Sequence, residues 1–234
     1  MKMYKAIDYF FPNWNALFSE EVEIGLGIDA LKMLIDSQEK SWDAINKKLD
    51  DAIKNDEFLN GLDDELKGSY FTQIYEYELM MLSKLKMAQR HFSCLSIFSF
   101  FEGRLKALYT KIENEHNLNP ILNNRPGISD YWGYLTKQYK IDKNEIEPLY
   151  TPIKQQQFVR NCIAHNDSYF SKKDINEIFL MNGLRTITVG EFYQLEIYSS
   201  DYLLNLLDKM STFFNKLLRA IDDRYKEIKI ENGL

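Results

Sequence analysis

Apolar side chains recur every three or four residues along most of the chain, which is the period of an amphipathic α-helix. Residues 28–54 show this pattern and are predicted to form one helix, with apolar positions Ile28, Leu31, Leu34, Ile35, Trp42, Ile45, Leu49 and Ile53. Residues 200–228 carry a wider apolar stripe, with Leu203, Leu206, Met210, Phe213, Leu217 and Ile221 on one seam. A stripe that wide indicates a helix that contacts more than one neighbour.

Residues 65–115 form the longest helical stretch. They contain no proline and only Gly68 and Gly103 as weak breakers, which predicts either one very long helix or two. The second half carries a buried-type seam at Phe98, Phe101, Leu105, Leu108 and Ile112. Such a seam is typical of a helix in a bundle. The following residues, 114–130, are rich in Asn, Pro and Gly and are expected to form a loop.

Shorter elements are expected in the second half of the chain. One helix is predicted around residues 129–139 with Ser129 as its N-cap, and another over residues 144–165, with early prolines that separate or kink its first turns. From Glu177 the residues become β-branched and aromatic. Asn182-Gly183 tolerates positive φ, which predicts a β-hairpin with its turn there, and a further short strand is expected after Gly190. The fold class predicted is therefore mainly α: a helical bundle with a small β-hairpin before its C-terminal helix.

Composition and charge restrict the function. The 234 residues are 45% hydrophobic, enough for a substantial core, and the formal net charge is -6. An acidic chain does not attract nucleic acid through its overall field, so any such contact has to be local. Cys94 and Cys162 show no metal-ligand spacing and fit a reducing compartment, so a cytoplasmic location is predicted. No segment has the roughly 20 uninterrupted apolar residues of a membrane span, so no membrane association is expected.

The segment "FVRNCIAHNDSYF", residues 158–170, gathers three polar side chains that suit chemistry: Arg160, Asn161 and His165. On an ideal helix Asn161 and His165 lie about 40° apart, but Arg160 and His165 lie about 140° apart. Arg160 and His165 therefore converge only if the helix ends or unwinds at His165. The next residues, Asn-Asp-Ser, compete for backbone hydrogen bonds and predict such an end.

RNA cleavage suits these side chains. The negative end of a helix dipole favours a positively charged imidazole, and a histidine so placed can transfer protons near neutral pH. His165 could take the proton from a 2′-hydroxyl or give one to the leaving oxygen, while the guanidinium of Arg160 holds the phosphate. A single histidine serves one of these roles, or two copies of the chain share both. The reaction requires neither a metal nor a cofactor, and we predict neither.

The stretch "RNCIAHND" resembles the motif of the HEPN superfamily: an Arg, then a polar residue such as Asn, then a His after a short gap. The match covers Arg160, Asn161 and His165. Residues 91–112 resemble the earlier bundle helix of that family, in which an acidic residue often faces the motif. The resemblance makes Glu102 the candidate for that place, with Arg104 as a candidate substrate contact.

The resemblance implies a HEPN-like bundle, a homodimer with a composite cleft, RNA as substrate and 2′,3′-cyclic phosphate products. It further implies a toxin, abortive-infection or antiviral effector, with a regulatory or antitoxin protein as a candidate partner. It covers about residues 65–228, so residues 63–234 are predicted to form the HEPN-like domain and residues 1–62 an N-terminal helical arm packed on it. Lys172 and Lys173 either reach phosphates or lie in a solvated loop.

Structural roles are the alternative for the same side chains. Arg160 could form an ion pair with Glu102 or Asp167, while His165 could cap its helix and Asn161 bind a backbone carbonyl. Cys162, three residues before His165, also permits a Cys–His nucleophile.

Two functions remain open. In the first, the chain is a metal-independent endoribonuclease with His165 as general acid or base, Arg160 stabilising phosphate charge and Asn161 orienting one of them. In the second, it is a non-catalytic HEPN-like module for dimerisation or for binding nucleotides or RNA.

Overall fold

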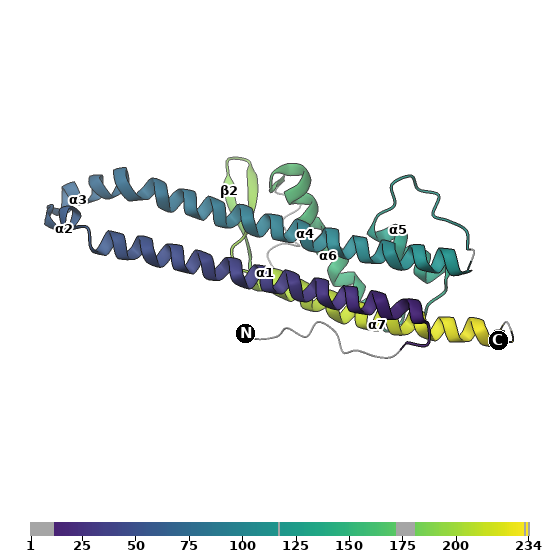
Figure 1. The fold of residues 1–234 in the computed structure, drawn as a ribbon. Helices are drawn as coiled ribbons and strands as arrows, with labels where there is room; N and C mark the ends of the chain where they lie inside the picture. Colours follow the sequence, from purple (N-terminus) through teal and green to yellow (C-terminus); the bar gives the residue numbers. More distant parts are fainter. Residues whose placement is uncertain (1–11, 117, 172–180, 232, 234) are drawn as a thin grey trace.

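The computed structural model describes residues 12–116, 118–171, 181–231 and 233 (Figure 1). The chain is mainly helical with a small antiparallel sheet before the C-terminal helix, which confirms the predicted fold class. The long helices are α1 (Asn15–Lys54), α4 (Tyr77–His116), α6 (Glu147–Asn166) and α7 (Asp201–Glu231). The short helical segments are α2 (Glu57–Gly61), α3 (Asp64–Phe71), the π-helical η1 (Thr72–Glu76), α5 (Ile128–Gly133) and the π-helical η2 (Tyr134–Gln138). The strands are β1 (Tyr169–Ser171), β2 (Leu184–Val189) and β3 (Phe192–Ile197).

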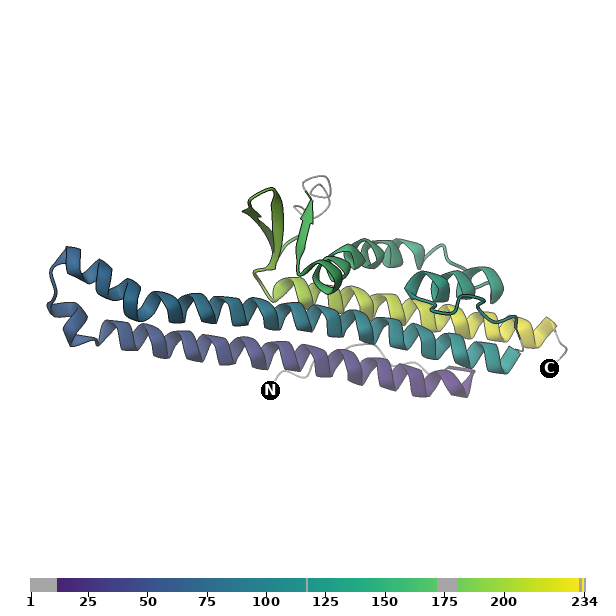
Figure 2. The same ribbon diagram turned by 90° about the horizontal axis from the view of Figure 1, so that it is seen from above.

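Helices α1 and α4 form a long antiparallel hairpin, closed at one end by α2 and α3 (Figure 1). The predicted helix over residues 28–54 is therefore part of a longer one that begins at Asn15. The region from 65 to 115 is helical throughout, because α3 runs through the π-helical turn η1 into α4. One end of this hairpin projects beyond the other elements (Figures 1 and 2). We call residues 36–90 the arm; it differs from the N-terminal arm, residues 1–62, expected from the sequence.

The core lies in the body of the molecule, where α1, α4, α6 and α7 pack together. Every residue of the predicted α4 seam is buried, and so is every residue of the predicted α7 seam. Helix α1 contributes Leu17, Ile24 and Ile28 to the same cluster. The first helix is thus integrated in the bundle, and the proposed division at residue 62 stays a prediction. In the arm, by contrast, Leu59 and Tyr75 are the only buried apolar side chains.

The sheet has the strand order β1-β3-β2, with both pairs antiparallel. The expected strand after Gly190 is present as β3, and Phe192 at its start pairs with both Ser171 of β1 and Val189 of β2. Strands β2 and β3 form a hairpin that turns at Gly190, which has a φ of 60°. The chain also turns at Asn182-Gly183. Gly183 also has a positive φ, 87°, but it lies before β2, where its carbonyl accepts from the backbone N–H of Tyr198 at 3.0 Å. Residues 177–180 of the predicted hairpin lie outside the described residues.

Two helix starts differ from their predictions. Ser129 does not cap α5, because the N-cap residue is Gly127, whose N–H donates to the carboxylate of Asp130 at 2.9 Å. The Ser129 hydroxyl accepts from Lys154 Nζ instead. Helix α6 runs without a break from Glu147, with a proline in its first turn and Pro152 inside it, so its first turns are not separate. Among the described residues, no helix combines the length and the apolar character needed to cross a membrane.

Candidate functional site

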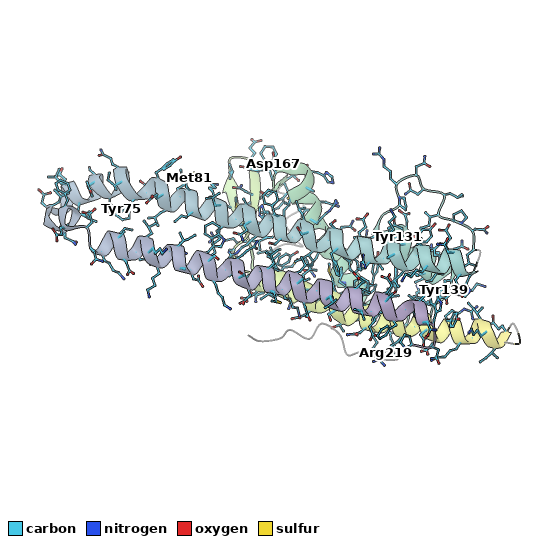
Figure 3. All side chains as sticks on the ribbon, viewed as in Figure 1. Tyr75, Met81, Tyr131, Tyr139, Asp167 and Arg219 are labelled. Carbon is cyan, nitrogen blue, oxygen red and sulfur yellow. The ribbon has the colours of Figure 1, made fainter. Side chains whose placement is uncertain are left out.

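The end of α6 has the geometry that the Asn-Asp-Ser sequence predicts. The helix ends at Asn166, one residue after His165, and Asp167 and Ser168 both adopt left-handed backbone conformations, with φ of 48° and 67°. The N–H of Ser168 donates back to the carbonyl of Cys162 at 3.1 Å, which satisfies one of the last helical acceptors. The carbonyl of Ser168 then accepts from the N–H of Leu195 in β3 at 2.8 Å. The helix end is therefore fixed to the sheet, with Asp167 beside it (Figure 3).

The three motif side chains meet at this helix end. Arg160 Nη1 donates to Asn161 Oδ1 at 3.0 Å and lies 3.5 Å from His165 Nε2. The long side chain of Arg160 spans the offset that an ideal helix places between it and His165. Asn161 and His165 are exposed, and Arg160 is half-buried. We call these residues the Arg-Asn-His cluster. It presents one guanidinium, one amide and one imidazole to solvent within contact distance of each other.

Arg160 is not held in the ion pairs that a structural role would require. Neither Glu102 nor Asp167 forms a salt bridge with it, and no other carboxylate among the described residues does. Its charge instead acts on Cys94 of α4: burial raises the pKa of the Cys94 thiol to about 12, and Arg160 partly opposes that rise. A guanidinium that pairs with none of the described carboxylates is available to a phosphate.

Cys162 is buried on the inner side of α6, and its thiol approaches the carbonyl of Tyr169 at 3.5 Å. This orientation favours a packing role over the alternative of a Cys–His nucleophile with the exposed His165.

Glu102 and Arg104 make their contacts elsewhere. Burial raises the pKa of Tyr131 on α5 and the charge of Glu102 adds to that rise, so Glu102 lies near α5. Arg104 faces α1, with Nη1 at 3.6 Å from Glu20 Oε2 and 3.8 Å from Glu23 Oε2. Among the described residues, no hydrogen bond or salt bridge joins either candidate to the Arg-Asn-His cluster.

The candidates Lys172 and Lys173 lie outside the described residues. Among the residues that are described, no three His, Cys, Asp or Glu side chains are grouped as metal ligands would be.

A groove of about 540 Å³ adjoins the cluster. It is lined by Phe158, Asn161, Cys162, His165, Asn166, Tyr169, Phe170, Ser171 and Phe192. We call it the aromatic groove. Phe192 is 56% exposed, and Tyr169 is exposed beside it in the neighbouring strand. Two further lining residues, Phe158 and Phe170, contact each other edge-on, with 6.2 Å between their ring centroids. The groove thus joins two motif side chains to open aromatic faces.

Sequence reasoning did not find the aromatic groove. Tyr169 and Phe170 stand within the motif segment and alternate as strand residues do, which was a usable signal. Local sequence does not place Phe192 there, because it reaches the groove only through its pairing opposite Ser171.

Searches of protein-family models, curated proteins and solved structures find no match to this chain. The HEPN resemblance therefore rests on the motif residues and on residues 91–112 of the sequence alone.

Proposed function

We propose that this chain is a metal-independent endoribonuclease that cleaves RNA through its own 2′-hydroxyl groups and leaves 2′,3′-cyclic phosphate ends. One observation carries the proposal: Arg160, Asn161 and His165 form a single accessible cluster, joined at 3.0 and 3.5 Å. Anion-binding and proton-transferring groups are thereby placed next to each other. This is the pair of functions that phosphodiester transfer requires.

Each side chain has a role in the reaction. The 2′-oxygen attacks phosphorus, and the bond from phosphorus to the 5′-oxygen breaks. The 2′-hydroxyl loses its proton to a base, and the leaving 5′-oxygen receives a proton from an acid. His165 performs one of these proton transfers, acting as base when Nε2 is neutral and as acid when it is protonated. Arg160 balances the charge that develops on the phosphate oxygens, and Asn161 orients Arg160 through their hydrogen bond. The second proton transfer would come from His165 of a second copy in a composite cleft.

The aromatic groove supports single-stranded RNA as the substrate. Unpaired bases stack on exposed aromatic side chains with little dependence on sequence, and each stacked base contributes about 1–3 kcal/mol to binding. Phe192 and Tyr169 provide such faces beside His165. Binding through a local groove is also compatible with a net charge of -6, since it does not depend on a broad positive surface. Within a cell, such an activity suits a toxin or antiviral effector, with a regulatory or antitoxin protein as its partner.

A second candidate function is a non-catalytic HEPN-like module that dimerises or binds nucleotides or RNA. The observation that favours it is that no hydrogen bond or salt bridge among the described residues links Glu102 to the cluster, while its charge adds to the raised pKa of Tyr131 on α5. If catalysis depends on an acidic residue at that place, the cluster would bind a phosphate without cleaving.

The test uses purified wild type, His165→Ala and Arg160→Ala with a mixed-sequence single-stranded RNA in EDTA. Arg125→Ala is the matched control, since Arg125 is an exposed arginine in the loop before α5. We expect the wild type and the control to cleave, and both cluster variants to lose about 100-fold or more in rate. Mass spectrometry of the products should show 2′,3′-cyclic phosphate ends.

Two results would distinguish the alternatives. Unchanged cleavage by His165→Ala would show that the cluster is not the active site. RNA binding that depends on Arg160, without cleavage by the wild type, would support the non-catalytic module instead.

A further inference from the structure

One side of α4 carries large apolar side chains in contact with solvent. Tyr77, Met81, Leu85 and Phe92 are between 39% and 68% exposed. Together with the smaller or partly covered side chains between and beyond them, they form the α4 stripe, which consists of Tyr77, Met81, Leu85, Ala88, Phe92, Leu95 and Ser99. From Met81 onward, successive members are four, three, four, three and four residues apart. This is the seven-residue repeat by which two helices pair along their length.

The α4 stripe is not the surface that packs on α1. The contacts from α4 to that helix come from other positions: Gln89 bonds to Trp42, while Lys86 and Arg90 pair with Glu39. At 100° per residue, the stripe is centred about 140° around the helix from these positions. Figure 3 shows Met81 on the edge of α4 that faces away from α1. The stripe therefore lies on the outer face of the hairpin.

Charge is scarce along the α4 stripe. Between Met81 and Ser99 the charged residues are Lys84, Lys86 and Arg90, and the last two are paired with Glu39. The centres of protein interfaces are depleted in charged residues, and contiguous exposed apolar surface marks an interaction site. Both properties indicate a protein partner for this face.

We propose that the α4 stripe pairs with the α4 stripe of a second copy of this chain, the two helices running antiparallel. In an antiparallel pair, the a positions of one helix face the d positions of the other across a two-fold axis. One register opposes Ala88 to the partner's Phe92 and Leu85 to the partner's Leu95. The small side chain of Ala88 then leaves the space that the phenyl ring needs, at two symmetric places. This match of small to large within one stripe makes a second copy the occupant.

The same pairing would relate two proposed sites by one two-fold axis. Burial raises the pKa of the Cys94 thiol and the charge of Arg160 partly opposes that rise, so Arg160 lies at about the same level along α4 as Phe92 and Leu95, although Cys94 itself points into the core. A second copy seated on Phe92 and Leu95 would place its own Arg-Asn-His cluster across the same two-fold axis. The inference deepens the homodimer of the proposed function. Its support, however, comes from α4 alone and does not depend on RNA cleavage.

The first test is the oligomeric state in solution, measured by analytical ultracentrifugation over a range of concentrations. We expect the wild type to show twice its chain mass of 27.7 kDa. Leu85→Glu and Phe92→Glu should each raise the dimer dissociation constant by at least about 30-fold, the effect of losing an interface hot spot. Leu122→Glu is the matched control, because Leu122 is 93% exposed in the loop before α5 and should not change the mass. Since all three positions are exposed, circular dichroism should show an unchanged fold.

A second test examines the register. Leu85→Glu and Leu95→Lys should each weaken self-association, and mixing the two variants should restore a dimer, because the register brings the new charges together. Failure of the mixture to associate would overturn the antiparallel register.

Three outcomes bear on the proposal as a whole. A wild type that remains monomeric up to about 100 µM would overturn it, as would a dimer that neither glutamate variant weakens. A dimer that loses association in both variants but cleaves no RNA would support this interface and count against the proposed nuclease.

Discussion

The ion pair at the base of the arm allows a quantitative test of the structure through Glu39→Gln. Glu39 lies on α1 and accepts two hydrogen bonds from Arg90 of α4, at 2.7 Å from Nε and 2.6 Å from Nη2. Lys86 Nζ is 3.6 Å from the same carboxylate. Arg90 also donates to the carbonyls of Ile197, the last residue of β3, and of Tyr198, which follows it. One arginine thereby joins α1, α4 and the sheet, and it depends on Glu39 for its charge partner.

The expected magnitude follows from the burial of this pair. The side chains of Glu39 and Arg90 are 20% and 11% exposed, between a surface pair and a buried one. Exposed pairs contribute about 0–1 kcal/mol, whereas breaking a buried pair costs about 3–5 kcal/mol because a charge is left without a partner. Glutamine keeps one acceptor oxygen and nearly the same volume but removes the charge. We therefore expect Glu39→Gln to lower the free energy of unfolding by about 2–3 kcal/mol at neutral pH.

The same pair predicts a pH dependence. Burial alone would raise the pKa of Glu39, but the hydrogen bond and charge of Arg90, together with Lys86, outweigh it and hold the pKa below the ordinary 4.5. A carboxyl with a lower pKa in the folded state contributes its full stability above the unfolded pKa. That contribution is lost as the pH falls through the folded pKa. The difference between wild type and Glu39→Gln should therefore shrink below pH 4.5.

Urea denaturation followed by circular dichroism, at neutral pH and at several acidic values, measures both effects. Asp36→Asn is the control, since Asp36 pairs with Lys40 on the exposed side of α1 and should cost less than about 0.5 kcal/mol. If Glu39→Gln falls within the same 0.5 kcal/mol of wild type at neutral pH, the reasoning about the burial of this pair is wrong. A difference that persists unchanged in acid would refute the ionic origin.

Three further predictions concern the core, acid stability and the aromatic groove. Phe101 is fully buried, and its ring centroid lies 5.4 and 5.2 Å from those of Phe213 and Phe214. Phe101→Ala should therefore lower the free energy of unfolding, measured by urea denaturation, by about 3–5 kcal/mol, and a decrease below about 1 kcal/mol would contradict this packing. Burial lowers the pKa of His91 below its ordinary 6.5, so the unfolded chain binds the proton more readily and stability should fall as the pH drops below that value. His91→Gln should flatten this slope in unfolding measured between about pH 7 and 5, and an equal slope in both proteins would exclude His91 as its source. Phe192→Ala should weaken the binding of a non-cleavable 2′-deoxy oligonucleotide by about 5- to 100-fold while Phe192→Tyr keeps it, and equal binding by all three proteins would remove the groove from the substrate path.

Periodicity determined which parts of the fold were predictable. The seams of α4 and α7 were identified residue by residue, because a buried helix face repeats every three or four positions whatever it packs against. The sheet was less predictable, because Gly183 and Gly190 both have positive φ and only strand pairing decides which strands lie side by side. Local sequence does not contain that pairing.

The candidate site shows a similar limit. Convergence of Arg160 and His165 followed from the helix-ending residues after His165, which act locally. The placement of Glu102 and Arg104 depends on which face of α4 meets α1 and which meets α5, and that is decided by the packing of whole helices. The meeting of neighbouring side chains at a helix end can therefore be predicted from local sequence, whereas the placement of residues on another helix cannot.

The arm has a consequence for the cooperativity of folding. Among the apolar side chains of its 55 residues only Leu59 and Tyr75 are buried, so little hydrophobic free energy couples it to the body. Backbone amides of the arm should therefore exchange with deuterium through a partial opening that leaves the body intact, well before global unfolding. The molecule would then consist of two cooperative units within one continuous pair of helices. The Glu39–Arg90 pair lies at the border between them, and association through α4 would slow exchange in the outer unit.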